Sequence, residues 1–328
     1  MKNDRNIKKI VLICAGFALL FAVIVGGLHI MESTFFNSEP EQTEPESSKT
    51  VEKEETKYFP RQDITTILFI GVDEEGPVEE KDYNSGSAYS DSVVLLIFDE
   101  TNKEINAIAL NRDSMVEMPM IDENGKRKGS FYGQLTFAHS FGNGLEESCE
   151  NTVWTVSDLL GGAQIDYYFS MNMDAISIIN DAVGGVTVNV TDDFSEIGWD
   201  VPKGEYTLYG DEAEKFVRAR MGLGDGLNSS RMERQKEYVF GFIEAFEAKE
   251  EENSLFAVET FEEVSDYVLT NCSLTTISDF SEKFEEYELK EIVVPQGEYV
   301  LGEKFYEFYI DEEDLENIVL KYLYAPKS

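Results

Sequence analysis

Basic residues are scarce in this sequence of 328 residues. It holds 27 Lys and Arg against 65 Asp and Glu, which gives a formal net charge of −38. Binding to the phosphate backbone of nucleic acid requires an extended basic face. The charge balance therefore argues against a nucleic-acid partner, and most of the acidic excess is expected to form a solvated surface.

Cysteine is also rare, with three residues in the chain. Cys14 lies in the long apolar run described next, whereas Cys149 and Cys272 lie in the remainder of the chain. A disulfide between the latter two requires an oxidising compartment. The sequence leaves open whether they pair or remain thiols.

A single apolar run is long enough to cross a bilayer. Residues 10–30 contain no Asp, Glu, Lys or Arg, and a hydrocarbon core of about 30 Å needs roughly 20 such residues. Four basic residues precede the run, so the positive-inside bias places residues 1–9 in the cytoplasm and the rest of the chain outside. We therefore predict a single-pass anchor in the cell membrane, with a cleaved signal peptide as the alternative.

The remainder divides into a stalk and a folded part. Residues 31–60 are rich in Glu, Ser, Thr and Pro and are predicted to form an acidic, disordered stalk. From residue 61 to residue 328, apolar runs of strand length (64–72, 91–99 and 105–111) alternate with helical patterns. This alternation predicts one α/β domain, with a central mixed sheet flanked by helices on both faces.

The later helices have recognisable limits. Asn172 is predicted to cap a helix that Gly184 ends. Residues 211–220, 229–246 and 254–269 read as mostly helical, and a late strand (291–295) and a closing helix follow.

Two aspartates adjoin the first strands. One strand ends at Asp73 and the next begins at Asp91, so both carboxylates would lie at one end of the sheet if these strands are neighbours. Mg²⁺ binds one or two carboxylates and leaves positions for phosphate oxygens. In a chain with 65 acidic residues, however, the default expectation is that Asp73 lies in a loop and Asp91 caps a strand, and metal binding is the alternative.

Arg112 and Asp113 follow the third strand directly. Such an adjacent pair is more often a local salt bridge than part of a site, so a salt bridge is the expectation and a site is the alternative.

Four of the eight arginines fall between Phe216 and Gln235, in a segment with a glycine-rich bend. They are Arg218, Arg220, Arg231 and Arg234. A guanidinium offers a planar fork that matches phosphate oxygens, which a lysine does not. The cluster therefore favours a phosphate or pyrophosphate site, unless its members merely neutralise nearby acids.

A series of ordered motifs spans about residues 64–248: "FIGVDEE", "YSDSVVLLIFDETNKEINAIALNRDSMVEMP", "LTFAHSFGNG", "LLGGAQIDYYFSMNMDAISIINDAVGGVTVNV", "LYGDEAEKFVRAR" and "RMERQ". In these motifs the chain resembles the LytR–CpsA–Psr family of Gram-positive cell-envelope proteins. This resemblance implies Mg²⁺-dependent transfer of a glycan phosphate from a polyprenyl-pyrophosphate carrier to peptidoglycan. The polymer would be teichoic acid, capsule or a similar anionic wall polysaccharide.

The resemblance also implies roles for individual residues. Asp73 and Asp91 match the metal-binding carboxylates, and Arg112 matches the arginine of the family's "PRD" motif. The pyrophosphate-binding set corresponds to Arg112, Arg218, Arg220, Arg231 and Gln235. The general base would be Asp91 or Asp113, and a lipid pocket would lie along the helix around residues 176–183.

The chain departs from the family pattern at three places. Tyr89 and Ser90 precede Asp91 where an arginine is usual, Gln134 replaces a lysine, and Asn111 replaces the proline of "PRD". The alternatives to a transferase are thus a non-catalytic binder or sensor of polyprenyl-phosphate lipids, and a polyprenyl-pyrophosphate phosphohydrolase. His139, within one matching motif, is expected to be a packed or capping residue.

Overall fold

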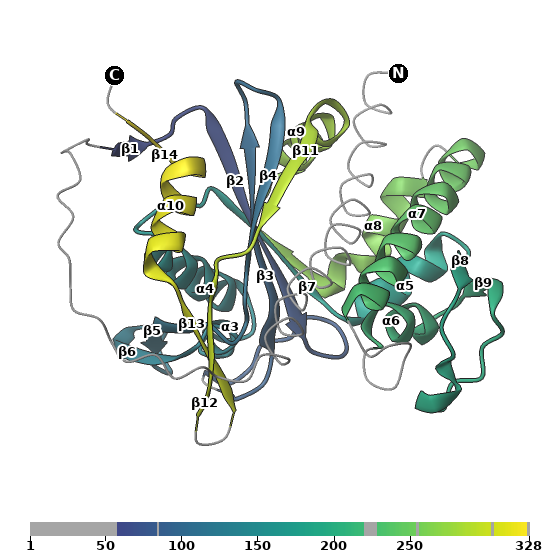
Figure 1. The fold of residues 1–328 in the computed structure, drawn as a ribbon, viewed down its shortest axis with the longest axis horizontal. Coiled ribbons are helices and arrows are strands. Elements are labelled where there is room, and N and C mark those ends of the chain that lie inside the picture. The colour runs from purple at the N-terminus through teal and green to yellow at the C-terminus, as the bar shows by residue number, and fades with distance from the viewer. Residues whose placement is uncertain (1–57, 84, 220–227, 254–255, 303–304, 327–328) are drawn as a thin grey trace, which may run out of the picture.

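A mixed sheet of six strands forms the centre of the molecule (Figure 1). The computed structural model describes residues 58–83, 85–219, 228–253, 256–302 and 305–326. In spatial order the strands are β10 (Val268–Thr270), β7 (Tyr167–Asn172), β2 (Ile64–Asp73), β3 (Tyr89–Asp99), β4 (Glu104–Leu110) and β11 (Glu288–Val293). β2 is parallel to β7 and β4 to β11, whereas the other neighbours are antiparallel. The predicted α/β class and mixed sheet are confirmed.

The central strands are buried on both faces because their side chains are apolar almost throughout. On β2, Ile67 and Phe69 enter one core, whereas Leu68 and Ile70 enter the other, and all four are at most 1% exposed. Burying a side chain of this size contributes roughly 1.5–3 kcal/mol. A slip of one residue would exchange the two faces, so the register is strongly specified.

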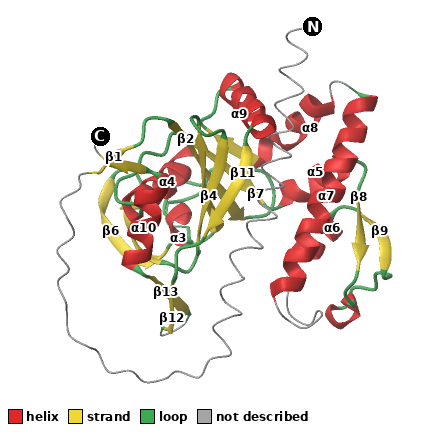
Figure 2. Ribbon diagram, turned by 45° about the horizontal axis from the view of Figure 1, so that its top comes forward, coloured by secondary structure: helices red, strands yellow, loops and turns green. Residues whose placement is uncertain are grey.

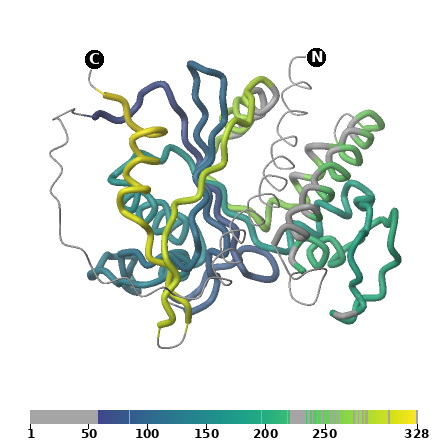
Figure 3. Tube along the Cα trace, viewed as in Figure 1, coloured from purple at the N-terminus to yellow at the C-terminus, as the bar shows by residue number. Residues whose placement is uncertain are grey.

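Helices cover both faces of the sheet, as the sequence predicted (Figure 2). One face packs against α5 (Asp174–Ala182), α6 (Asp211–Arg218), α7 (Asn228–Glu252), α8 (Phe256–Val264), α9 (Leu274–Glu286), the hairpin of β8 (Val186–Val190) and β9 (Gly204–Leu208), and the short helices η1 (Phe194–Ile197) and η2 (Ser265–Tyr267). The other face packs against α3 (Phe137–Ser140), α4 (Glu146–Leu159) and α10 (Glu312–Tyr322). Figure 3 shows the late strand β11 beside β4, although most of the domain's sequence lies between these two strands.

Three small two-stranded sheets were not predicted. They pair β5 (Met115–Ile121) with β6 (Arg127–Gln134), β12 (Gly297–Leu301) with β13 (Tyr306–Ile310), and β1 (Tyr58–Pro60) with β14 (Tyr324–Pro326). β6 and β12 consist mostly of exposed residues, and Glu117 and Pro119 interrupt the apolar run of β5, so these strands lack the long apolar runs that revealed the central strands. The first two hairpins lie next to each other, since Ser114 bridges to Phe308.

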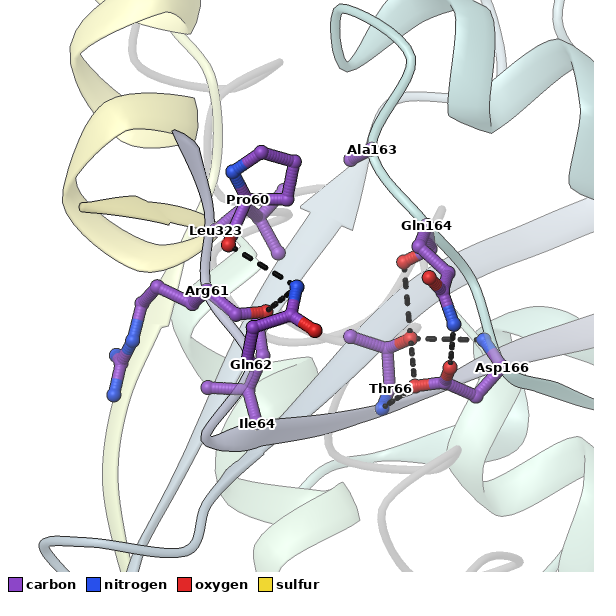
Figure 4. A pocket seen from close by; sticks show the side chains of 9 residues that line it. All are labelled: Pro60, Arg61, Gln62, Ile64, Thr66, Ala163, Gln164, Asp166 and Leu323. Atoms are coloured by element: carbon purple, nitrogen blue, oxygen red, sulfur yellow. Dashed lines mark hydrogen bonds between the residues drawn. The ribbon is translucent and has the colours of Figure 1, made fainter. Parts of the chain in front are cut away.

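The folded part begins a few residues before the predicted boundary. β1 pairs with β14, and the backbone N–H of Arg61 donates to Leu323 O at 2.9 Å. Arg61 and Leu323 both line the pocket drawn in Figure 4. The Arg61 guanidinium donates to Asp63 at 2.7 Å and to Asp99 at 2.8 Å, and its hydrogen bond lowers the pKa of Asp63 to about 2. These contacts fix the entry of the chain beside a polar cavity of about 230 Å³.

Two details of the helix predictions are wrong. Asn172 does not cap a helix: it ends β7 and donates through Nδ2 to Gly76 O at 2.9 Å, because α5 begins only at Asp174. The last residues of the segment 254–269 form η2 and the start of β10 and are not α-helical. Gly184 does end its helix, with a φ of +87° that suits glycine.

Several predictions concern the cysteines and the N-terminal segments. Cys149 and Cys272 are both free thiols, and burial raises the pKa of Cys149 to about 12. The predicted anchor at 10–30 and nearly all of the stalk lie outside the described residues. Within the described part of the chain, no helix is both long and apolar enough to cross a membrane.

Gly241 marks a close approach of α7 to β8. A Cβ at this position would lie 2.2 Å from the backbone oxygen of Thr187. We expect Gly241→Ala to lower the free energy of unfolding by about 1–3 kcal/mol, because the helix must move away from the hairpin. Urea unfolding followed by circular dichroism measures this. Glu244→Ala, at an exposed position of α7, should change stability by no more than about 0.5 kcal/mol; equal values for the two variants would contradict the packing.

Candidate active site

The two aspartates highlighted by the sequence lie at the same end of the sheet. β2 and β3 are antiparallel neighbours, and Asp73 at the end of β2 pairs with Tyr89 at the start of β3. The predicted proximity of the two strand ends is therefore confirmed. Asp73 is exposed, whereas the Asp91 side chain is 16% exposed.

Asp91 occupies a β-bulge. Ser92 pairs with Gly71 and Ser90 pairs with Val72, so Asp91 is the extra residue between them. A bulge interrupts the ladder and changes the direction of a side chain. This local irregularity gives Asp91 an orientation that the alternation of a regular strand would not provide.

The segment before Asp91 is held by buried contacts. Ala88 has a φ of +56°, which is uncommon for a residue other than glycine. His139 approaches Ala88 O through Nδ1 at 3.0 Å, and Ser90 N donates to Thr136 O at 3.0 Å. His139 is 3% exposed, and burial lowers its pKa to about 4. It is the packed histidine that the sequence suggested, and it supports the turn that leads to Asp91.

Arg112 lies between two carboxylates. Its guanidinium forms an ion pair with Asp91, and its Nε is 3.8 Å from Asp113 Oδ1. The Arg112 side chain is 38% exposed, so one side of the guanidinium remains open to a ligand. Arg112 follows β4, and its closer partner is Asp91 on β3. The local salt bridge with Asp113 is therefore not the main interaction of Arg112.

Gln134 contributes an uncharged side chain to this group. It is 8% exposed and donates through Nε2 to Asp113 Oδ1 at 3.0 Å and to Tyr306 O at 2.8 Å. Asn111 accepts a hydrogen bond from the backbone N–H of Asp113 at 2.9 Å. Gln134 thus contributes no charge to this group. Arg112, by contrast, is a cation and contacts both Asp91 and Asp113. The sequence identified Gln134 as a departure but gave no signal for its contact with Tyr306.

The arginine-rich segment is described only in part. Arg218 is the last residue of α6, and Arg231 and Gln235 belong to α7, which packs against α6. The side chains of these three residues and the whole of Arg220 lie outside the described residues. The chain leaves the helical conformation at Ala219, with φ −55° and ψ 126°, close to the predicted point. Convergence of these side chains on a pyrophosphate stays a prediction.

Arg234 has a structural role and is not available to bind phosphate. Its side chain is 3% exposed and forms an ion pair with Asp192. It also donates to Phe216 O at 3.2 Å and to Ala219 O, which are carbonyls near the end of α6. Burial lowers the pKa of Arg234. Of the two roles that the sequence allowed for Arg234, phosphate binding or neutralisation of a nearby acid, the structure therefore supports the second.

The metal and lipid sites can be compared with the geometry. The described residues contain no cluster of three or more His, Cys, Asp or Glu side chains suited to a metal. Asp73 and Asp91 at one end of the sheet fit the small carboxylate set that Mg²⁺ uses together with phosphate oxygens. Ile176, Ile179 and Val183 of the predicted lipid-binding helix belong to the buried core on their face of the sheet, and a lipid pocket there stays a prediction.

The fold and this site define an α/β protein with a half-open arginine–carboxylate centre at one end of a mixed sheet. The chain belongs to the LytR_cpsA_psr family, whose model matches residues 31–321. The resemblance noted in the sequence is therefore confirmed.

Curated relatives carry transferase names. TagU of Bacillus licheniformis, a polyisoprenyl-teichoic acid–peptidoglycan teichoic acid transferase, is 28% identical over 196 residues, which are 60% of this chain and 56% of TagU. The match thus spans little more than half of that relative. TagT of Bacillus subtilis, with the same transferase description, is 25% identical over 283 residues, or 83% of this chain and 80% of TagT.

Solved structures share the fold. A structure described as "TagT bound to LIIa-WTA" superposes with a TM-score of 0.54 at 22% identity, and the match covers 79% of this chain and 89% of that one.

The buried His139 gives a pH prediction. The unfolded chain binds a proton near the ordinary pKa of 6.5, whereas the folded protein binds it only near pH 4. The stability linked to this residue is therefore present above pH 6.5 and is lost as the pH falls towards 4, by roughly 3 kcal/mol. Urea unfolding between pH 7 and pH 4 should show a smaller decrease in His139→Gln than in the wild type. Parallel pH profiles would exclude this effect.

Arg234 gives a stability prediction. We expect Arg234→Ala to lower the free energy of unfolding by about 3–5 kcal/mol, because it leaves Asp192 without its partner. The double variant Arg234→Met/Asp192→Asn should lose less than Arg234→Ala alone. Chemical denaturation provides both values. If Arg234→Ala were no more harmful than Ala at the exposed Lys203, the structural role would be refuted.

Proposed function

We propose that the protein transfers a glycan phosphate from a polyprenyl-pyrophosphate carrier to a hydroxyl of peptidoglycan. The observation that carries this proposal is the half-open Arg112, fixed between Asp91 and Asp113 at the end of the sheet. A guanidinium in this position can bind phosphate oxygens in a planar fork. Membership of the family and the transferase names of TagU and TagT support the same reaction, and the binding of LIIa-WTA by TagT supports a wall glycopolymer as the substrate class. The polymer would be teichoic acid, capsule or a similar anionic wall polysaccharide.

The proposed step exchanges one phosphoester bond for another. The acceptor hydroxyl oxygen attacks the phosphorus attached to the glycan, and the bond from this phosphorus to the bridging oxygen breaks. Polyprenyl phosphate leaves with the bonding electrons. The proton of the hydroxyl passes to a carboxylate, for which Asp91 and Asp113 are the candidates.

Arg112 is suited to stabilise the charge that develops on the phosphate oxygens. Arginines placed where charge develops provide much of the catalysis in phosphoryl transfer. Arg218, Arg220, Arg231 and Gln235 would extend this binding to the second phosphate. Asp73 and Asp91 would hold Mg²⁺, which supplies Lewis-acid stabilisation of the phosphates when bound.

A second function deserves a test because of Gln134. A neutral side chain contacts Asp113 at a position where the family usually has lysine, and Tyr89 donates its hydroxyl to Gly86 O at 2.6 Å. Fewer cations face the phosphates, which favours a protein that binds the lipid without turning it over. Release of phosphate without an acceptor would instead indicate a phosphohydrolase.

We also propose that residues 10–30 anchor the chain as a single membrane span, with the folded part outside the cell. The lipid carrier and the wall acceptor of the proposed reaction meet on that side of the membrane.

Site variants test the transferase proposal. The full chain in detergent is incubated with a polyprenyl-pyrophosphate-linked glycan, Mg²⁺ and glycan strands, and donor loss and polymer attachment are measured by mass spectrometry. We expect Asp91→Ala, Arg112→Ala and Arg218→Ala each to reduce transfer by about 100-fold or more. Chelation of divalent cations should have a similar effect.

The control for these variants is Lys290→Ala. Lys290 pairs with Glu104 at the opposite end of β4 from Arg112, so transfer should be unchanged. Donor binding without consumption by the wild type would reject the transferase and support the lipid sensor. Neither binding nor consumption would reject both.

A further inference from the structure

A cavity of about 290 Å³ opens close to the candidate active site, between the β5–β6 hairpin, the end of α4, β13 and the start of α10. Tyr132 and Tyr309 line it and are 57% and 39% exposed. Three carboxylates, those of Glu117, Asp158 and Glu312, complete its polar lining. We call this feature the tyrosine groove.

The tyrosine groove and the candidate active site share one face of the β5–β6 hairpin. Met115 pairs with Gln134 and Glu117 pairs with Tyr132 in the antiparallel register. Residues two apart on a strand point to the same side and are separated by about 7 Å. Gln134, which contacts Asp113, therefore shares its face with Tyr132 in the groove.

The backbone joins the second tyrosine to the site as well. Phe308 N donates to Asp113 O at 2.9 Å, and Gln134 donates to Tyr306 O at 2.8 Å, so β13 is attached directly to Asp113 and Gln134 of the candidate site. The Tyr309 hydroxyl donates to Glu307 at 2.7 Å, which restrains its ring. Tyr132 and Tyr309 thus lie on β6 and β13, two strands that contact the candidate site.

The charge of the groove selects against an anionic ligand. None of the ten residues that line it is basic, and three are acidic. A phosphate-rich polymer would be repelled here, whereas an uncharged saccharide can donate its hydroxyls to the carboxylates. Tyrosine rings provide rigid apolar surface for the faces of sugar rings together with a polar hydroxyl. A cavity of this size lies at the lower end of the range for ligand sites.

We infer that the tyrosine groove binds an uncharged saccharide strand and presents the acceptor hydroxyl to the Arg112 centre. The inference rests on the proposed function, for which it identifies the acceptor subsite. The anionic donor would then bind at the Arg112 centre, and the uncharged acceptor would bind at a different surface that is aromatic and acidic. This separation keeps the two polymers of the reaction from competing for one site.

Binding of glycan strands tests this inference. The full chain is sedimented with peptidoglycan from which the anionic polymers have been removed. We expect Tyr132→Ala and Tyr309→Ala each to weaken binding by about tenfold or more and to lower transfer accordingly. Tyr132→Phe, which keeps the ring, should retain most of the binding. Tyr58→Ala, at a tyrosine that is 42% exposed on β1, is the matched control and should bind as the wild type does.

Two outcomes would overturn the inference. The first is wild-type binding of stripped peptidoglycan by both alanine variants. The second is tighter binding of the wild type to peptidoglycan that still carries its anionic polymer than to stripped peptidoglycan, if this difference disappears in the tyrosine variants. Donor consumption is measured separately. If the wild type does not consume the donor, the proposed function is refuted. If donor consumption is normal and the tyrosine variants bind glycan strands as the wild type does, only the role of the tyrosine groove is refuted.

Discussion

The antiparallel placement of β3 between β2 and β4 creates the candidate site. Since β3 runs opposite to both neighbours, the end of β2, the start of β3 and the residues after β4 meet at one edge of the sheet. Asp91 and Arg112 meet for this reason, and Asp73 lies at the same end of the sheet. The apolar strands that fix this register are buried on both faces, so the site is built on one of the most stable parts of the fold.

Electrostatics explains why arginine matters in so acidic a chain. Arg112 contacts two carboxylates, those of Asp91 and Asp113, and Asp73 adds a third at the same end of the sheet. An anionic substrate therefore requires further cations, which the proposed arginines and a divalent ion would supply. Arg234 shows that an arginine near this region can instead be used for packing, because Asp192 and the carbonyls near the end of α6 occupy its donors.

The sequence predicted those features that depend on long apolar runs. β2, β3 and β4 were recognisable, and the position of Asp73 and Asp91 at the strand ends followed from their limits. The bulge at Asp91 and the inward orientation of Arg234 were not predictable, because both depend on pairing with residues distant in sequence. The β5–β6 and β12–β13 hairpins were missed because exposed residues interrupt their apolar pattern, and with them the contact between Gln134 and Tyr306.

The attachment of the chain at β1 has a mechanical consequence. β1 and the start of β2 lie at the opposite pole of the sheet from Asp91, about one strand length away. A force applied to the chain at Tyr58 would therefore be carried by β14 and by the bonds of Arg61 to Leu323 and Asp99. It would enter the fold at the end of β2 opposite to Asp73, about one strand length from the candidate site.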